Sequence, residues 1–216
     1  MEQEILKKWQ INVIDFVFSK DELNNFYLTG GTALAGYYLY HRISDDLDFF
    51  SFNNFDSMSI HAVAEELRKI IGADKARFSK LYDRNQFYYM VGGEELKIEF
   101  TKYPFKQLER AGNFKGVIID SEYDIAVNKL ITITDRFDPK DFVDLYFLLQ
   151  KYPLEKLQEA VKIKFNTKLD PITVGSSLAK VKMIKALPKM VKPLTIEELK
   201  EFFNLEARKL SPLVIS

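Results

Sequence analysis

The sequence predicts an α+β fold, in which a mixed sheet with flanking helices forms residues 1–120 and an all-helical part follows over residues 121–216. Two observations predict this division. Short runs of aromatic and β-branched residues, broken by Gly-Gly pairs, are concentrated before residue 120. After residue 120, apolar residues recur at helical spacing and are punctuated by prolines. Because no flexible Gly/Ser-rich linker separates the two parts, we expect them to pack together around a cleft.

The N-terminal part is expected to contain three helices and six strands. The clearest strand is 95–102, where Leu96, Ile98 and Phe100 alternate with polar residues. The predicted helices are 4–20, 32–40 and a segment capped by Asp56 or Ser57 that ends at Gly72. The predicted strands are 26–28, 46–52, 75–83, 86–91, 95–102 and 116–120, with a turn at Arg84-Asn85 between the third and fourth.

The C-terminal part is expected to be helical and basic. The predicted helices are 122–135, 139–151, 154–164, 172–186 and 195–208. From Val161 to Lys192 there are eight lysines and one acid, Asp170. Such a run is either a solvated helical face or a surface that contacts the phosphate backbone of a nucleic acid.

Composition excludes several classes of protein. The chain has no cysteine, which excludes disulfides, thiolate metal sites and cysteine nucleophiles. Its only histidines are His41 and His61, so a histidine-built zinc site is not expected. No apolar run reaches the roughly 20 residues that a membrane helix needs. We therefore expect a cytoplasmic protein without a membrane partner.

Two aspartates interrupt an otherwise apolar strand. Asp46 and Asp48 are two residues apart, so their side chains point to the same face while Leu47 and Phe49 enter the core. Two carboxylates on one face repel unless a cation lies between them. Mg²⁺ suits such a pair, because it prefers oxygen ligands and is often held by one or two carboxylates plus substrate phosphates. The alternative is an edge strand with an acidic, exposed face.

A glycine pair precedes these acids. Gly30, Gly31 and Thr32 follow a predicted strand and open a helix, where exposed amides and a hydroxyl suit a phosphate group. An ordinary strand-to-helix turn is the alternative. Because the short helix leads the chain back to Asp46 through Arg42, we expect the glycine turn, Arg42 and both acids to lie together as a triphosphate and metal site.

Four further residues are candidates for the same site. Glu99, on the polar face of strand 95–102, is the candidate third metal ligand, unless it is a surface glutamate. Lys129 interrupts an apolar helix and either extends to solvent or neutralises a phosphate. Asp141 and Asp144 are neighbours on the next helix, where capping alone would explain Asp141.

The segments "LTGGTALAGYYLYHRISDDLDFF" and "KDFVDLYFLL", with the lysine-bearing helix between them, resemble the nucleotidyltransferase AbiEii/AbiGii toxin family of the polymerase-β-like superfamily. The resemblance covers roughly residues 24–150. It implies a polymerase-β-like mixed sheet and transfer of a nucleoside monophosphate from an NTP. It also implies a toxin of a toxin–antitoxin or phage-defence pair, a cognate antitoxin partner and, in some members, modification of tRNA 3′ ends.

Within the resemblance, Gly31 and Thr32 match the family's G-[ST] motif, and Asp46 and Asp48 match its metal pair. Lys129 and either Asp141 or Asp144 match the downstream lysine and D-x-x-D motif. Two departures stand out in this chain. Pro139-Lys140-Asp141 replaces a more basic run, and the third acid is a glutamate rather than an aspartate.

The function predicted from these features is an Mg²⁺-dependent nucleotidyltransferase toxin that acts on an NTP, with tRNA or another RNA among the acceptors considered. Catalytic roles are predicted for Asp46, Asp48, Glu99, Lys129, Asp141 and Asp144, with Gly30, Gly31, Thr32, Arg42 and Lys129 binding the nucleotide. Two alternatives stay open. One is a non-catalytic member that binds nucleotide or a partner protein, and the other is an RNA-binding protein that uses the basic C-terminal face.

Overall fold

The computed structural model describes residues 5–210, which form two compact units. Within the described residues, the first unit consists of residues 5–38, 44–106 and 110–121, and the second of 39–43, 107–109 and 122–210. Two short segments of the N-terminal half, 39–43 and 107–109, therefore belong to the helical unit.

The first unit is built on a seven-stranded mixed sheet with the strand order β3-β4-β5-β2-β1-β7-β6. The strands are β1 (Phe26–Thr29), β2 (Leu47–Ser51), β3 (Lys75–Leu81), β4 (Arg84–Val91), β5 (Glu94–Lys102), β6 (Gly112–Phe114) and β7 (Val117–Ile119). At its centre, β2 runs antiparallel to β1 and parallel to β5. The predicted mixed α+β sheet is confirmed.

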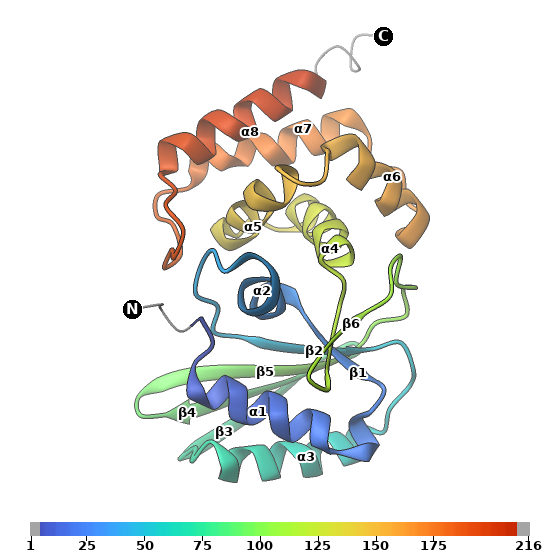
Figure 1. Cartoon of the computed structure of the whole chain (residues 1–216), viewed down its shortest axis with the longest axis vertical. Helices are drawn as coiled ribbons and strands as arrows, with labels where there is room; N and C mark the ends of the chain where they lie inside the picture. Colours follow the sequence, from blue (N-terminus) through green and yellow to red (C-terminus); the bar gives the residue numbers. More distant parts are fainter. Residues whose placement is uncertain (1–4, 211–216) are drawn as a thin grey trace. The chain divides into compact units, whose positions relative to one another are not determined.

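Helices cover both faces of this sheet. Figure 1 shows α1 (Lys8–Ser19) and α3 (Ser57–Ile70) on one face, and the helical run that begins with α2 (Gly30–Ala33) on the other. The run from α2 continues as a π-helix over Leu34–Leu39. A short 3₁₀-helix, Asp21–Leu23, connects α1 to β1. The core between these layers contains fully buried Leu47, Phe49 and Phe100.

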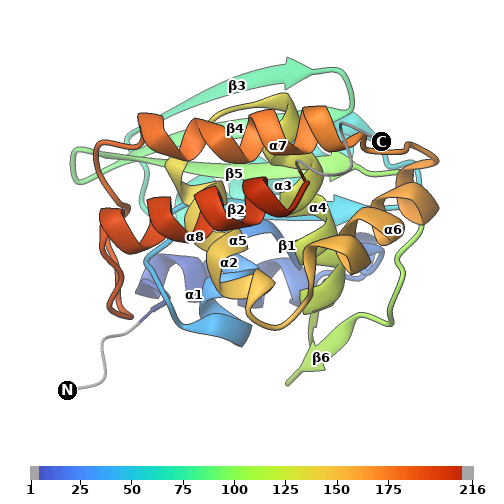
Figure 2. The ribbon, with the colours of Figure 1, turned by 90° about the horizontal axis from the view of Figure 1, so that it is seen from above.

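The second unit is helical, as predicted. Its helices are α4 (Glu122–Asp135), α5 (Pro139–Leu149), α6 (Leu154–Phe165), α7 (Pro171–Ala179) and α8 (Ile196–Leu210). Helices α5 and α7 each start with proline and are capped by the preceding aspartates, Asp138 and Asp170. Figures 1 and 2 show α7 and α8 side by side. Among the described residues, no helix is both long and apolar enough to cross a membrane.

Several element boundaries differ from the predictions. The turn between β3 and β4 lies at Tyr82-Asp83, not at Arg84-Asn85, and Tyr82 adopts a left-handed φ of 53°. Strand β6 was not predicted, because Gly112–Phe114 is too short to show alternation. The predicted helix 172–186 ends at Ala179 and continues as a 3₁₀-helix to Met183. Helix α1 starts at Lys8, and residue 4 of the predicted helix lies outside the described residues.

Candidate active site

The glycine turn and the aspartate pair lie together in the first unit. Strands β1 and β2 are antiparallel, and Thr29 pairs with Asp48. Gly30, the next residue, has a φ of +74°, and a Cβ atom built on it would lie 2.5 Å from Oδ2 of Asp48. Only glycine combines this φ with this close approach. The predicted adjacency of the diglycine and Asp48 is therefore present in the structure.

Asp46 is held next to the same turn through its backbone. The hydroxyl of Thr32 donates a hydrogen bond to the carbonyl oxygen of Asp46. Thr32 is almost completely buried, whereas Asp46 and Asp48 are both half-buried. Thr32 thus fixes the entry of the chain into β2, and phosphate binding by the amides at the start of α2 stays a prediction.

Glu99 lies beside Asp48 but is occupied by other side chains. The two residues are paired across the parallel strands β2 and β5. Arg84 binds both carboxylate oxygens of Glu99, at 2.6 and 2.8 Å, and Gln86 and Thr101 donate further hydrogen bonds at 2.9 and 2.6 Å. Burial alone would raise the pKa of Glu99, but these bonds and the nearby Lys97 charge lower it to about 2. Glu99 is therefore an ionised, fully compensated carboxylate.

Lys97 connects the two acids. Its Nζ lies 3.1 Å from Oε2 of Glu99 and 3.6 Å from Oδ1 of Asp48. Burial lowers the pKa of Lys97, but Asp48, Glu99 and Asp46 outweigh burial and raise it above 10.5. Among the described residues, no three His, Cys, Asp or Glu side chains are grouped to hold a metal ion. The metal-ligand role predicted for Asp46, Asp48 and Glu99 therefore stays a prediction, and a bound ion would need further ligands from phosphate and water.

Other predicted residues meet in the second unit, around Asp144. Arg42 donates to both oxygens of Asp144, at 2.6 and 2.8 Å, and its third nitrogen donates to the carbonyl oxygen of Ile43. Lys129 Nζ lies 2.6 Å from Oδ2 of Asp144, which Arg42 also binds, and 2.7 Å from Asp141. Arg42 is 1% exposed and Asp144 is fully buried, so Arg42 anchors Asp144 and does not present its charge to solvent.

The electrostatics of this cluster keep its members charged. Burial favours the neutral acid, but Lys129 and Arg42 hold the pKa of Asp144 well below 3.8. Burial also opposes the charge of Lys129, yet Asp144 and Asp141 raise its pKa. His41 is different, because burial lowers its pKa despite a 2.8 Å contact between Nε2 and Asp144. A neutral His41 donates its Nε2 proton to Asp144.

Asp141 does not act as a simple helix cap. Its carboxylate accepts from Lys129 at 2.7 Å and from Arg136 at 3.0 Å. The cap of α5 is Asp138, which accepts from the backbone N–H of Lys140. The predicted site residues thus form two groups, one in each unit. Gly30, Gly31, Thr32, Asp46, Asp48 and Glu99 belong to the first unit, and Arg42, Lys129, Asp141 and Asp144 belong to the second.

Comparison with known proteins decides the family. The family described as "Nucleotidyl transferase AbiEii toxin, Type IV TA system" matches residues 16–213. The chain belongs to the AbiEii family. It is also 32% identical over 209 residues to an uncharacterized protein of Aquifex aeolicus, covering 94% of this chain and 97% of that protein.

Solved structures share the fold of this AbiEii protein. JHP933 of Helicobacter pylori superimposes with a TM-score of 0.58 at 20% identity, covering 94% of this chain and 89% of that one. MenT4, a nucleotidyltransferase toxin of Mycobacterium tuberculosis, gives a TM-score of 0.54 at 13% identity, covering 95% and 86%. The fold is that of polymerase-β-like nucleotidyltransferases, and the protein is a nucleotidyltransferase toxin.

Sequence reasoning missed two cations and one buried pair. The two cations are Lys97 and Arg84, which both form ion pairs with Glu99. The alternation of β5 had indicated only that Lys97 lies on the polar face of the strand. Lys164 pairs with fully buried Asp124 at 2.6 Å. Asp124 also accepts from the backbone N–H groups of Leu108 and Glu109, which ties residues 107–109 to the helical unit. A lysine within an apolar helical face was the available signal for Lys164.

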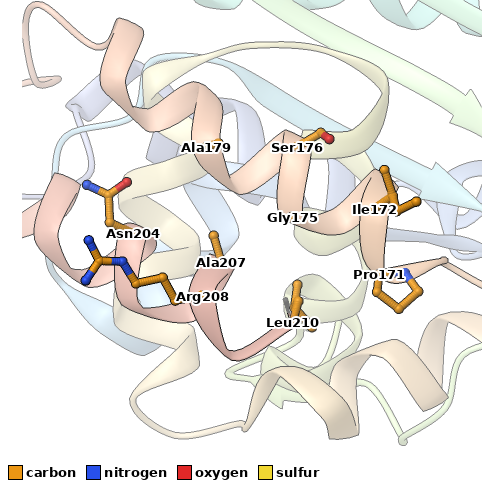
Figure 3. Close-up of a pocket in the computed structure, with 9 residues that line it drawn as sticks. All are labelled: Pro171, Ile172, Gly175, Ser176, Ala179, Asn204, Ala207, Arg208 and Leu210. Atoms are coloured by element: carbon orange, nitrogen blue, oxygen red, sulfur yellow. The ribbon is translucent and has the colours of Figure 1, made fainter. Parts of the chain in front are cut away.

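A separate groove lies between α7 and α8, with a volume of about 520 Å³ (Figure 3). Ile172 and Gly175 line it from α7, and Arg208 and Leu210 from α8. It contains none of the residues predicted to bind nucleotide or metal.

Proposed function

We propose that this AbiEii protein transfers a nucleoside monophosphate from an NTP, with Mg²⁺, to an RNA acceptor. The observation that supports the proposal is the close approach of Gly30 to Asp48. In the proposal, this turn binds an anion and Asp48 holds the metal ion beside it. Family membership supports the reaction class. The structural relatives support the fold on which such sites are built.

In this proposal the chain's own residues mainly orient the substrate. The backbone N–H groups at Gly31 and Thr32 bind phosphate oxygens, aided by the helical run that starts at Gly30. Asp46 and Asp48 hold the ion, while Thr32 keeps Asp46 in place. A bound Mg²⁺ supplies charge neutralisation and a template for the triphosphate.

In the second unit, Lys129 is proposed to bind a phosphate group. It is buried but for a small part of its side chain, and Asp141 and Asp144 hold its ammonium group in one position. A lysine fixed in this way can neutralise a phosphate without the entropy cost of ordering a flexible side chain. Arg42 and His41 contribute by orienting Asp144.

RNA is the favoured acceptor because of a basic surface segment, residues 180–192. Lys182, Lys185, Lys189 and Lys192 are exposed, and no ion pair joins them to another residue within the described chain. Backbone hydrogen bonds attach this segment to residues 41–43, because Ile43 donates to Lys189 and Val191 donates to His41. Unpaired lysines gain counterion-release free energy on binding phosphates.

The proposal is tested by incubating the protein with each α-labelled NTP, Mg²⁺ and total cellular RNA. Label should enter RNA, and Asp48→Asn should reduce transfer by roughly a hundredfold or more. Thr101→Val, which alters a hydroxyl beside Glu99 without touching the acid pair, is the matched control. Transfer that persists in Asp48→Asn, or label that enters no acceptor, would contradict the proposal.

The non-catalytic alternative and the RNA-binding alternative give different results. A non-catalytic protein would bind NTP without transferring label to any acceptor. An RNA-binding protein with an unused acidic site would bind RNA with a steep salt dependence, unchanged by Asp48→Asn. Lys182→Glu with Lys185→Glu should weaken RNA binding and flatten its salt dependence, because two exposed cations are reversed.

A further inference from the structure

The ammonium group of Lys97 lies against Asp48, the carboxylate proposed to hold a divalent ion. It comes from β5, whose parallel pairing with β2 sets Glu99 beside Asp48. Its ammonium nitrogen lies 3.6 Å from Asp48 and 3.1 Å from Glu99. The side chains of Lys97 and Asp48 are both about one-fifth exposed, at 20% and 21%, so water screens this pair less than an ordinary surface pair.

The contact with Asp48 is the one that needs explaining. Glu99 is already compensated by Arg84, which binds both of its oxygens, and by Gln86 and Thr101. The ammonium group of Lys97 is therefore not required to satisfy Glu99. It does reduce the repulsion between the negative charges of Asp48 and Asp46, both of which act on it electrostatically.

A divalent ion and the Lys97 ammonium cannot both lie against Asp48 without strong repulsion, because like charges at such short range are costly in a partly buried site. We propose that Lys97 is a built-in counterion of the Asp46–Asp48 pair, which a divalent cation displaces and which then binds the phosphates of a nucleoside triphosphate. This inference rests on the proposed function.

The displacement couples the two ligands. Without nucleotide, the divalent cation must break the Lys97–Asp48 contact and leave the ammonium group without a new partner. With nucleotide, the phosphates take up that group, so the ion binds more tightly. By linkage, the ion must improve nucleotide binding by the same factor. Lys97 therefore suppresses binding of the ion alone and favours binding of both ligands together.

The test measures Mn²⁺ binding by calorimetry or electron paramagnetic resonance, with and without an NTP analogue that has a non-hydrolysable α,β bridge. Neutral Lys97→Gln should bind Mn²⁺ alone more tightly, by about tenfold, and should lose most of the cooperativity with nucleotide. Lys97→Met is a second neutral variant, and Lys97→Arg, which keeps the charge, should behave like the wild type. Lys102→Gln, on the opposite face of the same strand, is the matched control.

Each outcome decides the question. Unchanged or weaker Mn²⁺ binding by both neutral variants would overturn the counterion role. If Mn²⁺ and the nucleotide analogue still bind cooperatively to Lys97→Gln, then Lys97 does not exchange its contact with Asp48 for one with the phosphates. Asp48→Asn separates this inference from the proposed function. If it binds Mn²⁺ as the wild type does, the ion is not at the acid pair and the proposed function itself fails.

Discussion

Asp144 should be one of the most sensitive positions for stability in the second unit. The change we consider is Asp144→Asn, which keeps the shape of the side chain and removes its charge. In the native cluster, buried Arg42 and Lys129 face buried Asp144 and Asp141, so two positive charges meet two negative charges. The variant leaves one buried positive charge in excess.

The cost of this excess charge follows from burial. Asp144 is 0% exposed and Arg42 is 1% exposed, and their contacts are 2.6 and 2.8 Å. Breaking a buried ion pair by removing one partner costs about 3–5 kcal/mol. For a chain of this size, that lowers the unfolding midpoint by roughly 6 °C or more. The free energy of unfolding should be measured by urea titration followed by circular dichroism.

A double variant separates the charge effect from loss of packing. The double variant Arg42→Met/Asp144→Leu removes one charge of each sign. Its loss in free energy of unfolding should be at least about 2 kcal/mol smaller than the sum of the losses of the two single variants. Arg136→Gln is the control, because its side chain is 57% exposed and its pair with Asp141 should contribute less than about 1 kcal/mol. Asp144→Asn within 1 kcal/mol of the wild type, or a strictly additive double variant, would refute the reasoning.

Three further changes test other parts of the structure. Gly30→Ala should destabilise the first unit by about 1–3 kcal/mol and reduce transfer, because its Cβ would meet Asp48 at 2.5 Å and its φ is +74°; unchanged unfolding and unchanged activity would contradict this. Lys164→Met should lower the free energy of unfolding, measured by urea titration, by about 2–3 kcal/mol, because Asp124 keeps its backbone donors but loses its cation. An unchanged free energy would mean that the Lys164–Asp124 pair does not stabilise the fold. Stability should also fall in acid through Asp144. The pKa of Asp144 in the folded protein is well below its ordinary value of 3.8, so on acidification the unfolded chain takes up the proton first. The contribution of ionised Asp144 to the free energy of unfolding is therefore complete above about pH 5 and is lost as the pH falls through the folded pKa. Unfolding titrations should show a weaker acid dependence in Asp144→Asn; an identical pH profile would argue against this assignment.

The local features of the site could be predicted from the sequence. Alternation placed Asp46 and Asp48 on one face of a strand, and the glycines marked a tight turn. A short connection between them made adjacency the natural expectation. The structure agrees, because Thr29 pairs with Asp48 and Gly30 follows directly. Patterns of this kind are local, so a single sequence carries them.

The long-range pairs could not be predicted in the same way. Arg42 and Asp144 are 102 residues apart, and each was marked as unusual without a sign of its partner. Arg42 was expected to meet a triphosphate, whereas the structure commits all three of its nitrogens to Asp144 and Ile43. Sequence periodicity identifies a face of an element but not what packs against that face.

Alternation also misled where both faces of a strand are covered. On β5 the residues Lys97, Glu99 and Thr101 follow the polar period, which predicts an exposed face. Glu99 and Thr101 are buried instead. Arg84 and Gln86 on β4 donate hydrogen bonds to Glu99, which also accepts one from the hydroxyl of Thr101. The π-helix over Leu34–Leu39 was likewise expected as an ordinary α-helix, since propensity does not distinguish the two.

Burial assigns different roles to the two acids that the sequence treated alike. Asp48 is partly exposed, and its contact with Lys97, at 3.6 Å, is a weak one that the proposed cation would replace. Asp144 is fully buried and is compensated by Arg42 and Lys129 at 2.6 Å, contacts that cannot be given up without stranding a charge. An exchangeable counterion suits a ligand for a metal ion, and a permanent one suits a residue that holds a lysine in place. We therefore propose that the same residue type serves metal binding in the first unit and positioning in the second, and that the difference lies in whether its positive partner can leave.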